Sequence, residues 1–323
     1  MAEILYLSDA NVAACGLGMD KVVEIVLDAY RCKGRGGVEM PPKPAVHPSP
    51  DSQLHAMPAY IQGLQSVGMK WIGTFPSNGA KGLPVVSGLI VLNNPETGLP
   101  LCVMDCRRVT AMRTGAKTAA TARYLARPSS HAVGIVGCGV QGRSNLDALA
   151  CEFEIEIVHA FDVDESAAKR FAEEVSRSRF DVRVVASAEE AIREMDIVVT
   201  SSPIRSKPEP VAPASWLNPG GFYAPVDYDS FFTGDAMMAM DLFVTDDTAQ
   251  FEYYRSLGYF LQAPPMDRVH DLGAVVSGAA PRRTGDDQLT MAMNLGIGMD
   301  DVAVAMELYR CAKRKGLGTV LEL

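Results

Sequence analysis

The segment VGIVGCGVQGRSNL, residues 133–146, constrains the fold most, because three closely spaced glycines follow an apolar run and precede a helical pattern. Gly137 permits a tight turn, Gly139 lets a pyrophosphate approach the backbone, and Gly142 lets the helix pack closely on its strand. Glycines at this spacing also arise by chance, and an ordinary tight turn is the alternative. The surrounding sequence has to supply the other parts of a dinucleotide site.

Strand-like runs alternate with helical patterns after this loop, which is typical of parallel α/β folds. The predicted strands are residues 132–137, 156–162, 182–187, 196–202, 221–227, 242–247 and 289–296, and the predicted helices begin at Val140 or span 165–175 and 188–195. The sequence therefore predicts a doubly wound domain that binds a dinucleotide at the glycine loop. A domain of this kind that has lost its ligand is the alternative.

Asp162 ends the strand that follows the loop, about 20 residues after the last glycine. A carboxylate at this place accepts hydrogen bonds from the ribose of the adenosine half and repels a 2′-phosphate. No arginine follows it directly in FDVDES, so NAD is favoured over NADP. Thr200, Ser201 and Ser202 end a further strand of the same sheet and could line the cofactor cleft. A solvated Asp162 and a simple polar turn are the alternatives.

The first hundred residues predict a different architecture, a helix followed by antiparallel strands. Residues 19–34 carry an apolar helical stripe, and the later β-rich runs are 54–61, 67–75, 87–93 and 100–105, with a hairpin connection at 93–98. From about residue 107 the sequence becomes Ala-rich and helical. A last helix over 300–316 ends with basic residues and a glycine.

Composition narrows the possible partners and the compartment. Hydrophobic residues make up 48% and charged residues 21% of 323 residues, and the formal net charge of −9 argues against a nucleic-acid partner. No apolar run reaches the length of a membrane span, and the N-terminal stretch predicts no signal peptide. Seven scattered cysteines without a CxxC pair predict a reduced, cytoplasmic protein without a metal site.

Three basic residues outside the loop are candidate substrate ligands. Arg113 lies on an Ala-rich helix face, and its planar fork suits a carboxylate; a surface arginine is the alternative. Lys70, within VGMKWIGTF, is either on a half-exposed strand face or a semi-buried amine that aids proton transfer. Lys43, between prolines, either contacts a carboxylate or lies in an exposed loop.

Asp227 and Asp229 follow a predicted strand in PVDYDS. Carboxylates at the C-terminal end of a strand in a cofactor-binding sheet are candidate general acid/base groups. The alternative is that Asp229 or Ser230 caps a short following helix. The sequence favours neither interpretation.

Several motifs occur together in an order that resembles the ornithine cyclodeaminase/mu-crystallin family. They are MPAY (57–60), Lys70, the ETGLPLCVMD hairpin, TAMRTGA (110–116), the GCGVQG loop and NLGIGMDD (294–301). The resemblance covers nearly the whole chain.

The resemblance implies a homodimer with two domains in each chain. Residues 1–112 with 300–323 would form a substrate-binding and dimerisation domain of α+β type, and residues 113–299 an NAD-binding Rossmann domain. It also implies residue roles. Asp229 and Lys70 would be catalytic, the substrate would contact Lys43, Met57, Arg113 and Asp227, and the cofactor would contact Thr114, Gly115, Gly137, Gly139, Val140, Gln141, Gly142, Asp162, Thr200, Ser201, Ser202, Val226 and Asn294.

The implied reaction takes place at the α-carbon of an amino acid through an imine, and ornithine cyclodeamination to proline and ammonia is the activity expected first. A stoichiometric imine reductase or amino-acid dehydrogenase, and an inactive crystallin-like binding protein, are the alternatives. Two departures from the family pattern bear on the substrate. Lys43 stands where cyclodeaminases have an arginine, and PVDYDS replaces a glycine-rich sequence. The sequence therefore leaves the substrate open.

Overall fold

The computed structural model describes residues 3–175, 180–204 and 208–323, and the chain divides into two compact units. Unit 1 comprises Met1–Arg113 and Gly296–Leu323, and unit 2 comprises Thr114–Leu295. The sequence places these boundaries one residue earlier and four residues later, at 112/113 and 299/300. Helix α3 (Arg107–Leu125) continues without a break across the first of them, so no sequence signal marks that point.

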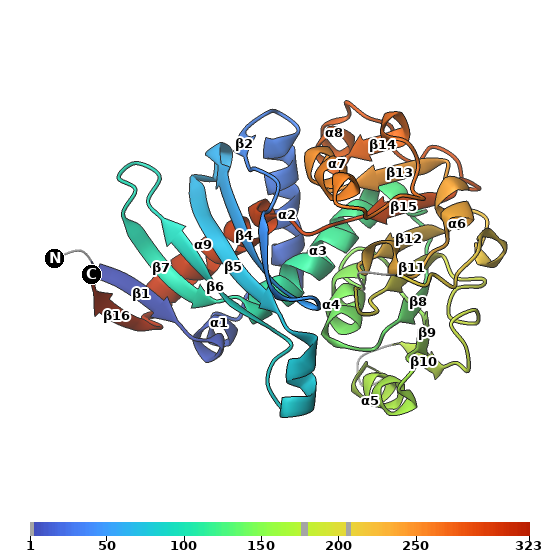
Figure 1. The fold of residues 1–323 in the computed structure, drawn as a ribbon, viewed down its shortest axis with the longest axis horizontal. Helices are drawn as coiled ribbons and strands as arrows, with labels where there is room; N and C mark the ends of the chain where they lie inside the picture. The colour runs from blue at the N-terminus through green and yellow to red at the C-terminus, as the bar shows by residue number, and fades with distance from the viewer. Residues whose placement is uncertain (1–2, 176–179, 205–207) are drawn as a thin grey trace. The chain divides into compact units, whose positions relative to one another are not determined.

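Unit 1 is a mostly antiparallel sheet with helices packed on it (Figure 1). The strand order is β16-β1-β7-β6-β5-β4-β2, β3 also pairs with β4, and the β1–β7 pair is parallel. Its elements are β1 (Glu3–Leu7), α1 (Asp9–Ala14), α2 (Met19–Lys33), β2 (Val38–Glu39), β3 (Ala45–Ser49), β4 (Ser52–Ile61), η1 (Gln62–Leu64), β5 (Ser66–Thr74), η2 (Pro76–Lys81), β6 (Val86–Asn93), β7 (Pro100–Asp105), α9 (Gly298–Lys315) and β16 (Thr319–Glu322).

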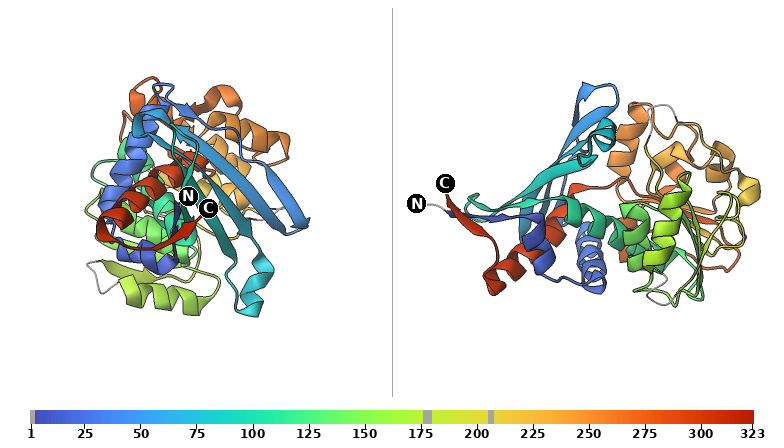
Figure 2. Two further views of the ribbon diagram at one scale, coloured as in Figure 1. Left: turned by 90° about the vertical axis from the view of Figure 1, so that its left-hand side faces the viewer. Right: turned by 90° about the horizontal axis from the view of Figure 1, so that it is seen from below.

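Helix α9 packs against β4, β5 and β6, and helix α2 packs against α9, so these helices cover one face of the sheet (Figure 2). Alternate residues of β4, among them His55, Met57 and Ala59, are buried, and so is Lys70 in β5. This period-two pattern shows which strand residues lie on the buried face. The antiparallel sheet and the helices over 19–34 and 300–316 were predicted, and the structure confirms them. The C-terminal strand β16 was not predicted.

Unit 2 is a parallel sheet in the order β10-β9-β8-β11-β12-β15-β13-β14. Its elements are β8 (Ala132–Val136), α4 (Val140–Leu149), β9 (Ile157–Phe161), α5 (Glu165–Val175), β10 (Asp181–Val184), β11 (Ile197–Thr200), η3 (Ala214–Trp216), β12 (Phe222–Pro225), η4 (Tyr228–Ser230), α6 (Gly234–Met238), β13 (Leu242–Thr245), α7 (Thr248–Ser256), η5 (Met266–Arg268), β14 (Val269–Asp271), α8 (Leu272–Ser277) and β15 (Thr290–Met293). The predicted α/β class with a doubly wound parallel sheet is confirmed.

One predicted helix is wrong. Residues 188–194 form consecutive turns, and Glu194 ends them with a left-handed φ of 64°. The backbone of this segment lies directly on β8, because a Cβ on Gly134 would be 1.8 Å from the Ala191 carbonyl oxygen. The chain reverses into β11 within a few residues, which leaves no room for a regular helix.

Gly298, the first residue of α9, lies so close to the backbone of β4 that any side chain there should destabilise the fold. A Cβ on Gly298 would lie 2.5 Å from the Met57 carbonyl oxygen and 2.9 Å from that of Pro58. We expect Gly298→Ala to destabilise unit 1 by about 1–3 kcal/mol, because neither backbone can move freely. Urea unfolding followed by the fluorescence of Trp71, in a Trp216→Phe background, measures this.

The matched control for this change is Gly79→Ala. A Cβ on Gly79 meets only Val85 Cγ2, at 3.7 Å. An unfolding midpoint of Gly298→Ala equal to that of Gly79→Ala would show that α9 does not depend on this close approach.

Candidate functional site

The glycine loop of unit 2 is tight on its inner side and open on its outer side. Gly137 has φ 91°, and a Cβ there would lie 2.8 Å from the Ser201 carbonyl oxygen. A Cβ on Gly142 would lie 2.4 Å from the Gly137 carbonyl oxygen. A Cβ on Gly139 meets none of the described atoms within 4 Å. The loop therefore keeps open space where a pyrophosphate would approach its backbone.

Helix α4 presents its N-terminus at this open side. Gly139 is the N-cap residue and provides no side-chain hydrogen bond, and Val140 is 67% exposed. Backbone N–H groups of such a helix start attract anions. Gln141, the next residue, uses its carbonyl oxygen to accept a hydrogen bond from the Asn145 side chain (2.8 Å) within the helix.

Asp162 follows β9 and lies beside the loop. One carboxylate oxygen accepts a hydrogen bond from the backbone N–H of Cys138 (2.8 Å), and the other from that of Asp164 (2.9 Å). These two bonds fix the carboxylate between the loop and the strand end. The arrangement fits a ribose ligand and excludes a freely solvated Asp162.

Asp227 ties two strand ends of unit 2 together. Its Oδ1 accepts a hydrogen bond from Thr200 Oγ1 (2.6 Å), and its Oδ2 accepts from the backbone N–H (2.9 Å) and Oγ (2.6 Å) of Ser202. Burial raises its pKa, and these hydrogen bonds oppose the rise. The sequence assigns Asp227 to the substrate, whereas both of its oxygens accept from residues at the end of β11.

Two other candidate cofactor residues are also held by hydrogen bonds within unit 2. Ser201 Oγ donates to Gly137 O (2.8 Å), and Val226 N–H donates to Thr200 O (2.8 Å).

Asp229 has a different environment from Asp227. Its Oδ2 accepts a hydrogen bond from the backbone N–H of Phe260 (2.7 Å), while Oδ1 is buried and has no hydrogen-bond partner among the described residues. Burial, the largest effect, raises the pKa of the carboxyl group. Tyr228 and Phe260 have left-handed φ values of 62° and 55°, so strained backbone flanks the carboxylate. Asp229 caps no following helix, since Thr233 is the N-cap of α6.

Helix α3 and the end of β15 carry the remaining candidate cofactor residues. A Cβ on Gly115 would lie 2.1 Å from the Ser144 carbonyl oxygen, so α3 and α4 pack backbone to backbone. Thr114 is buried one position earlier. Asn294 is buried and donates from Nδ2 to Thr121 Oγ1 (3.3 Å). Gly115 thus has a packing reason to be glycine besides any contact with a ligand.

A buried ion pair that the sequence did not suggest lies close to this segment. Asp246 Oδ2 pairs with Lys117 Nζ (2.5 Å), and Asp246 Oδ1 accepts from the backbone N–H of Leu295 (3.0 Å). This pair fixes the end of β15.

Unit 1 holds the candidate substrate ligands in a buried cationic cluster, defined here as Lys43, Lys70 and Arg113. Their exposed fractions are 6%, 0% and 6%, which excludes the surface interpretation of each. Lys70 Nζ lies 2.7 Å from Asp301 Oδ2, and Arg113 Nε lies 3.0 Å from Asp301 Oδ1. Lys43 Nζ donates to the Gly296 carbonyl oxygen (2.9 Å). Met57 is buried and pairs with Lys70 in the β4–β5 ladder.

Asp301 and His55 lie beside the buried cationic cluster, and the sequence did not point to either of them. An acid in the first turn of a helix is ordinarily read as a helix-dipole partner, and a histidine in a strand has no motif around it. Burial lowers the pKa of Lys70 to about 8; Arg113 adds to the effect, while Asp301 opposes it. Burial together with Lys43, His47 and Lys70 lowers the pKa of His55 to about 3. His55 is therefore a neutral imidazole among cations at physiological pH.

The low pKa of His55 predicts a pH dependence of stability. The unfolded chain takes up a proton near pH 6.5, and the folded chain only near pH 3, so stability falls as the pH drops through this window. The expected slope from this one group is about 1.4 kcal/mol per pH unit. His55→Gln should lose correspondingly less stability than the wild type between pH 6 and pH 4 (roughly that window).

Urea unfolding at a series of pH values measures the difference, again with Trp71 as the reporter. His131→Gln is the control, because His131 is exposed and is not among the groups that lower the pKa of His55. Parallel pH curves for His55→Gln and the wild type would contradict the buried, neutral imidazole.

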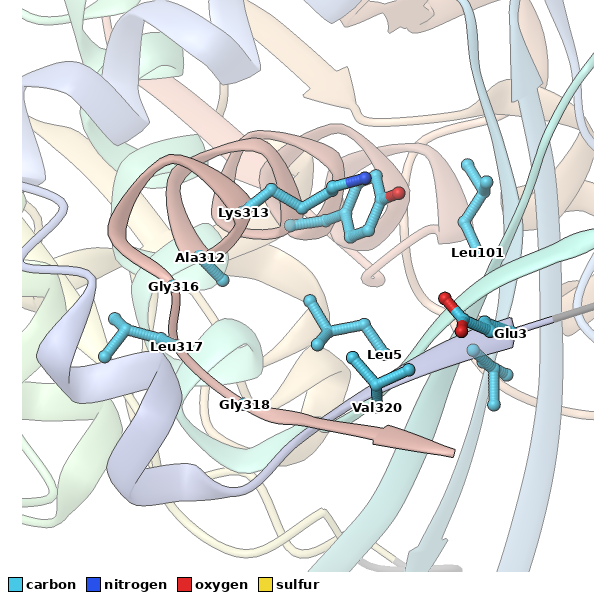
Figure 3. Close-up of a pocket in the computed structure, with 11 residues that line it drawn as sticks. Glu3, Leu5, Leu101, Ala312, Lys313, Gly316, Leu317, Gly318 and Val320 are labelled. Carbon is cyan, nitrogen blue, oxygen red and sulfur yellow. The ribbon is translucent and has the colours of Figure 1, made fainter. Parts of the chain in front are cut away.

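Unit 1 also has a cavity outside the candidate site. A cavity of about 280 Å³ lies where β1 and β16 meet the end of α9, lined by Leu5, Leu101, Tyr309, Lys313 and Val320 among others (Figure 3). None of the candidate residues lines it. Across the described ranges, no group of three or more His, Cys, Asp or Glu side chains could hold a metal ion, and no helix is long and apolar enough to span a membrane.

Comparison with known proteins places these observations in a family. The profile of the Ornithine cyclodeaminase/mu-crystallin family matches residues 7–316. The nodulation efficiency protein NfeD of Rhizobium meliloti is 36% identical, over 99% of each chain.

Among the solved structures that match over nearly their whole length are two with 33% and 28% identity. One is an archaeal alanine dehydrogenase dimer with bound NAD (TM-score 0.89, 33% identity, covering 100% of both chains). The other is the Δ1-pyrroline-2-carboxylate reductase of Thermococcus litoralis in complex with NADH and L-proline (TM-score 0.88, 28% identity, covering 98% of this chain and 99% of that one). These two relatives are an alanine dehydrogenase and a Δ1-pyrroline-2-carboxylate reductase, with NAD and NADH bound respectively.

Proposed function

Because the chain belongs to the ornithine cyclodeaminase/mu-crystallin family, we propose that it is an NAD-dependent oxidoreductase that interconverts an α-amino acid and its α-imino acid. The observation that carries this proposal is the buried cationic cluster of unit 1 in a chain that also has a dinucleotide loop. Asp301 pairs with two of these three cations, and a substrate carboxylate would add a second negative charge beside them.

Unit 2 fits NAD through its own groups. The open face at Gly139, the uncapped start of α4 and the Asp162 carboxylate match the pyrophosphate and the ribose. NAD when bound accepts or returns a hydride at the nicotinamide ring. Thr114, Val140 and Gln141 are proposed contacts of the same cofactor.

Residues of the chain bind the substrate, stabilise its nitrogen and take up the proton. Lys43 and Arg113 hold the substrate carboxylate, and Lys70 stabilises the nitrogen centre. When the α C–H bond of the amino acid breaks, the hydride leaves with its electron pair, and the nitrogen forms the imine and loses one proton. We assign that proton to Asp229, because its raised pKa and its buried oxygen, which has no hydrogen-bond partner among the described residues, suit a general base. Water then converts the free imine to a 2-oxo acid and ammonia.

A dehydrogenase or imine reductase is favoured over a cyclodeaminase by charge. A cyclodeaminase must hold the terminal ammonium of ornithine next to the α-carbon. Asp301 is the carboxylate that pairs with the cluster, and it already binds Lys70 and Arg113. His55 carries no charge beside these cations at physiological pH. A second positive charge on the substrate is repelled there.

The experiment that tests the function combines a substrate panel with product analysis. Purified protein is given NAD⁺ with single amino acids, or NADH with 2-oxo acids plus ammonia and with cyclic imines. The proposal requires net formation or consumption of NADH. Conversion of L-ornithine to proline without net NADH would show a cyclodeaminase, and no reaction with any compound would refute the proposal.

Replacement of Asp229 by Asn keeps the size of the side chain and removes its ability to take up a proton. We expect turnover to fall by about 10²–10⁴-fold, while NAD binding and the unfolding midpoint stay close to wild type. Steady-state kinetics and a cofactor fluorescence titration measure both. Asp227→Asn is the comparison: it leaves one accepting oxygen in place of two, so the bonds to Thr200 and Ser202 cannot both be kept, and stability should fall instead. Near-normal turnover of Asp229→Asn would transfer the proton step to another group.

Asp162 determines the cofactor preference in this proposal. The wild type should prefer NAD over NADP by about tenfold (~1.4 kcal/mol) or more, because a carboxylate repels the 2′-phosphate. Asp162→Ser should reduce that ratio by about the same factor, measured as kcat/KM with each cofactor. An NADP preference in the wild type would contradict the role given to Asp162.

We also propose a homodimer in a reducing, cytoplasmic setting. The face of the unit 1 sheet opposite α9 exposes Tyr6, Trp71 and Leu89 by 40%, 40% and 45%, and Trp71 and Leu89 are paired neighbours on β5 and β6. An apolar sheet face of this kind is typical of an interface between copies. All seven cysteines are free thiols, which suits a reducing compartment.

A further inference from the structure

Asp301 is the carboxylate that joins two cations of the unit 1 cluster. It lies in the first turn of α9, while Lys70 comes from β5 and Arg113 from α3. Its Oδ2 is 2.7 Å from Lys70 Nζ, and its Oδ1 is 3.0 Å from Arg113 Nε. The side chains of Asp301 and Lys70 are fully buried, and that of Arg113 is 8% exposed. One carboxylate thus connects three elements in the interior of unit 1.

The electrostatics of the cluster depend on this carboxylate. Lys70 and Arg113 repel each other, and burial disfavours the charged form of each. Burial and Arg113 both lower the pKa of Lys70, and Asp301 is the first of the groups that raise it. Without Asp301, Lys70 and Arg113 would lose the carboxylate that pairs with both of them, and two adjacent cations would remain buried.

The same carboxylate orients the guanidinium group of Arg113. A hydrogen bond at Nε fixes one edge of the planar fork. The terminal nitrogens lie against Gly296, because a Cβ there would be 3.0 Å from Nη1 and 3.3 Å from Nη2. Gly296 also accepts the hydrogen bond from Lys43 through its carbonyl oxygen. Contacts on two sides hold the fork in a single plane within the cluster.

We propose that Asp301 is a positioning residue of the reaction, which holds the Lys70 ammonium and the Arg113 guanidinium in fixed places without itself contacting the substrate. The inference rests on the proposed function, in which Lys70 and Arg113 act on the substrate. Asp301 would set both the direction of the carboxylate receptor and the pH at which Lys70 loses its proton.

The groups that face Lys70 come from every element around it. They are Asp301 on α9, Arg113 and Thr110 on α3, Cys106 before α3, and His55 on β4. Asp301 is the largest contributor that favours the ammonium form. Its replacement by Asn should therefore make Lys70 lose its proton at lower pH than the wild-type value of about 8.

The experiment compares the wild type with Asp301→Asn, Asp301→Glu and the control Glu307→Gln. Glu307 lies on the same helix and pairs with Arg310 and Arg314 near the surface. The full chain is labelled with ¹³Cε-lysine, the Lys70 signal is identified by its absence in Lys70→Arg, and its titration is followed by NMR. KM and kcat are measured with the most active compound of the substrate panel.

We expect the Lys70 titration of Asp301→Asn to move down by about one pH unit or more, and KM to rise about tenfold with a smaller change in kcat. Asp301→Glu keeps the charge, so it should restore the Lys70 titration while KM stays raised by the longer side chain. Glu307→Gln should match the wild type in both. A purely structural role predicts lower stability in both Asp301 variants with KM and the titration unchanged, and that result would overturn the proposal.

Two further outcomes would also test the positioning role of Asp301: failure of Asp301→Asn to fold, and absence of activity in the wild type. If Asp301→Asn does not fold, Asp301→Glu is the test, and a wild-type KM in that variant refutes positioning. If the wild type turns over no compound of the panel, the proposed function fails. The Lys70 titration needs no turnover, so an unchanged titration in Asp301→Asn would refute the effect of Asp301 separately.

Discussion

Helix α3 is one continuous hydrogen-bonded helix, and the boundary between the two units runs through it after Arg113. Arg113, a proposed substrate ligand, and Thr114, a proposed cofactor ligand, are therefore consecutive residues of one helix. The helix is buried on several sides at once, which its alanines allow: Ala116, Ala119, Ala120 and Ala122 are fully buried. At Gly115 even a methyl group would meet the backbone of α4. Small residues in this part of α3 therefore have a packing role within unit 2.

Much of the fold was predictable because local patterns and the final packing agree. The strand–glycine–helix segment at 132–149 and the helices at 19–33 and 165–175 have strong periodicity or strong end signals. Residues 188–194 misled because their composition suits a helix, while close backbone contact with Gly134 and the turn at Glu194 prevent one. The short strands β14 and β16 carry too few residues to show a period, and only their partners define them.

The sequence predicted individual residues of the candidate site, but it did not predict the ion pairs and hydrogen bonds between them. Lys70 and Arg113 were recognised by type and motif, but the carboxylate that joins them lies 188 residues beyond Arg113. Nothing local distinguishes Asp301 from an ordinary acid at a helix start. Asp227 and Asp229 show the same limit. They are two residues apart, yet one is bound by Thr200 and Ser202 and the other keeps a buried oxygen without a partner among the described residues.

The central claim is that a hydride passes between the α-carbon of an amino acid and NAD. Mass spectrometry of the cofactor after reaction with an α-deuterated amino acid tests it most directly, starting from the most active compound of the panel. The account predicts that NADH accumulates in step with the 2-oxo acid and carries the deuterium. Unlabelled NADH, or deuterium retained in a cyclised product without net NADH, would contradict it.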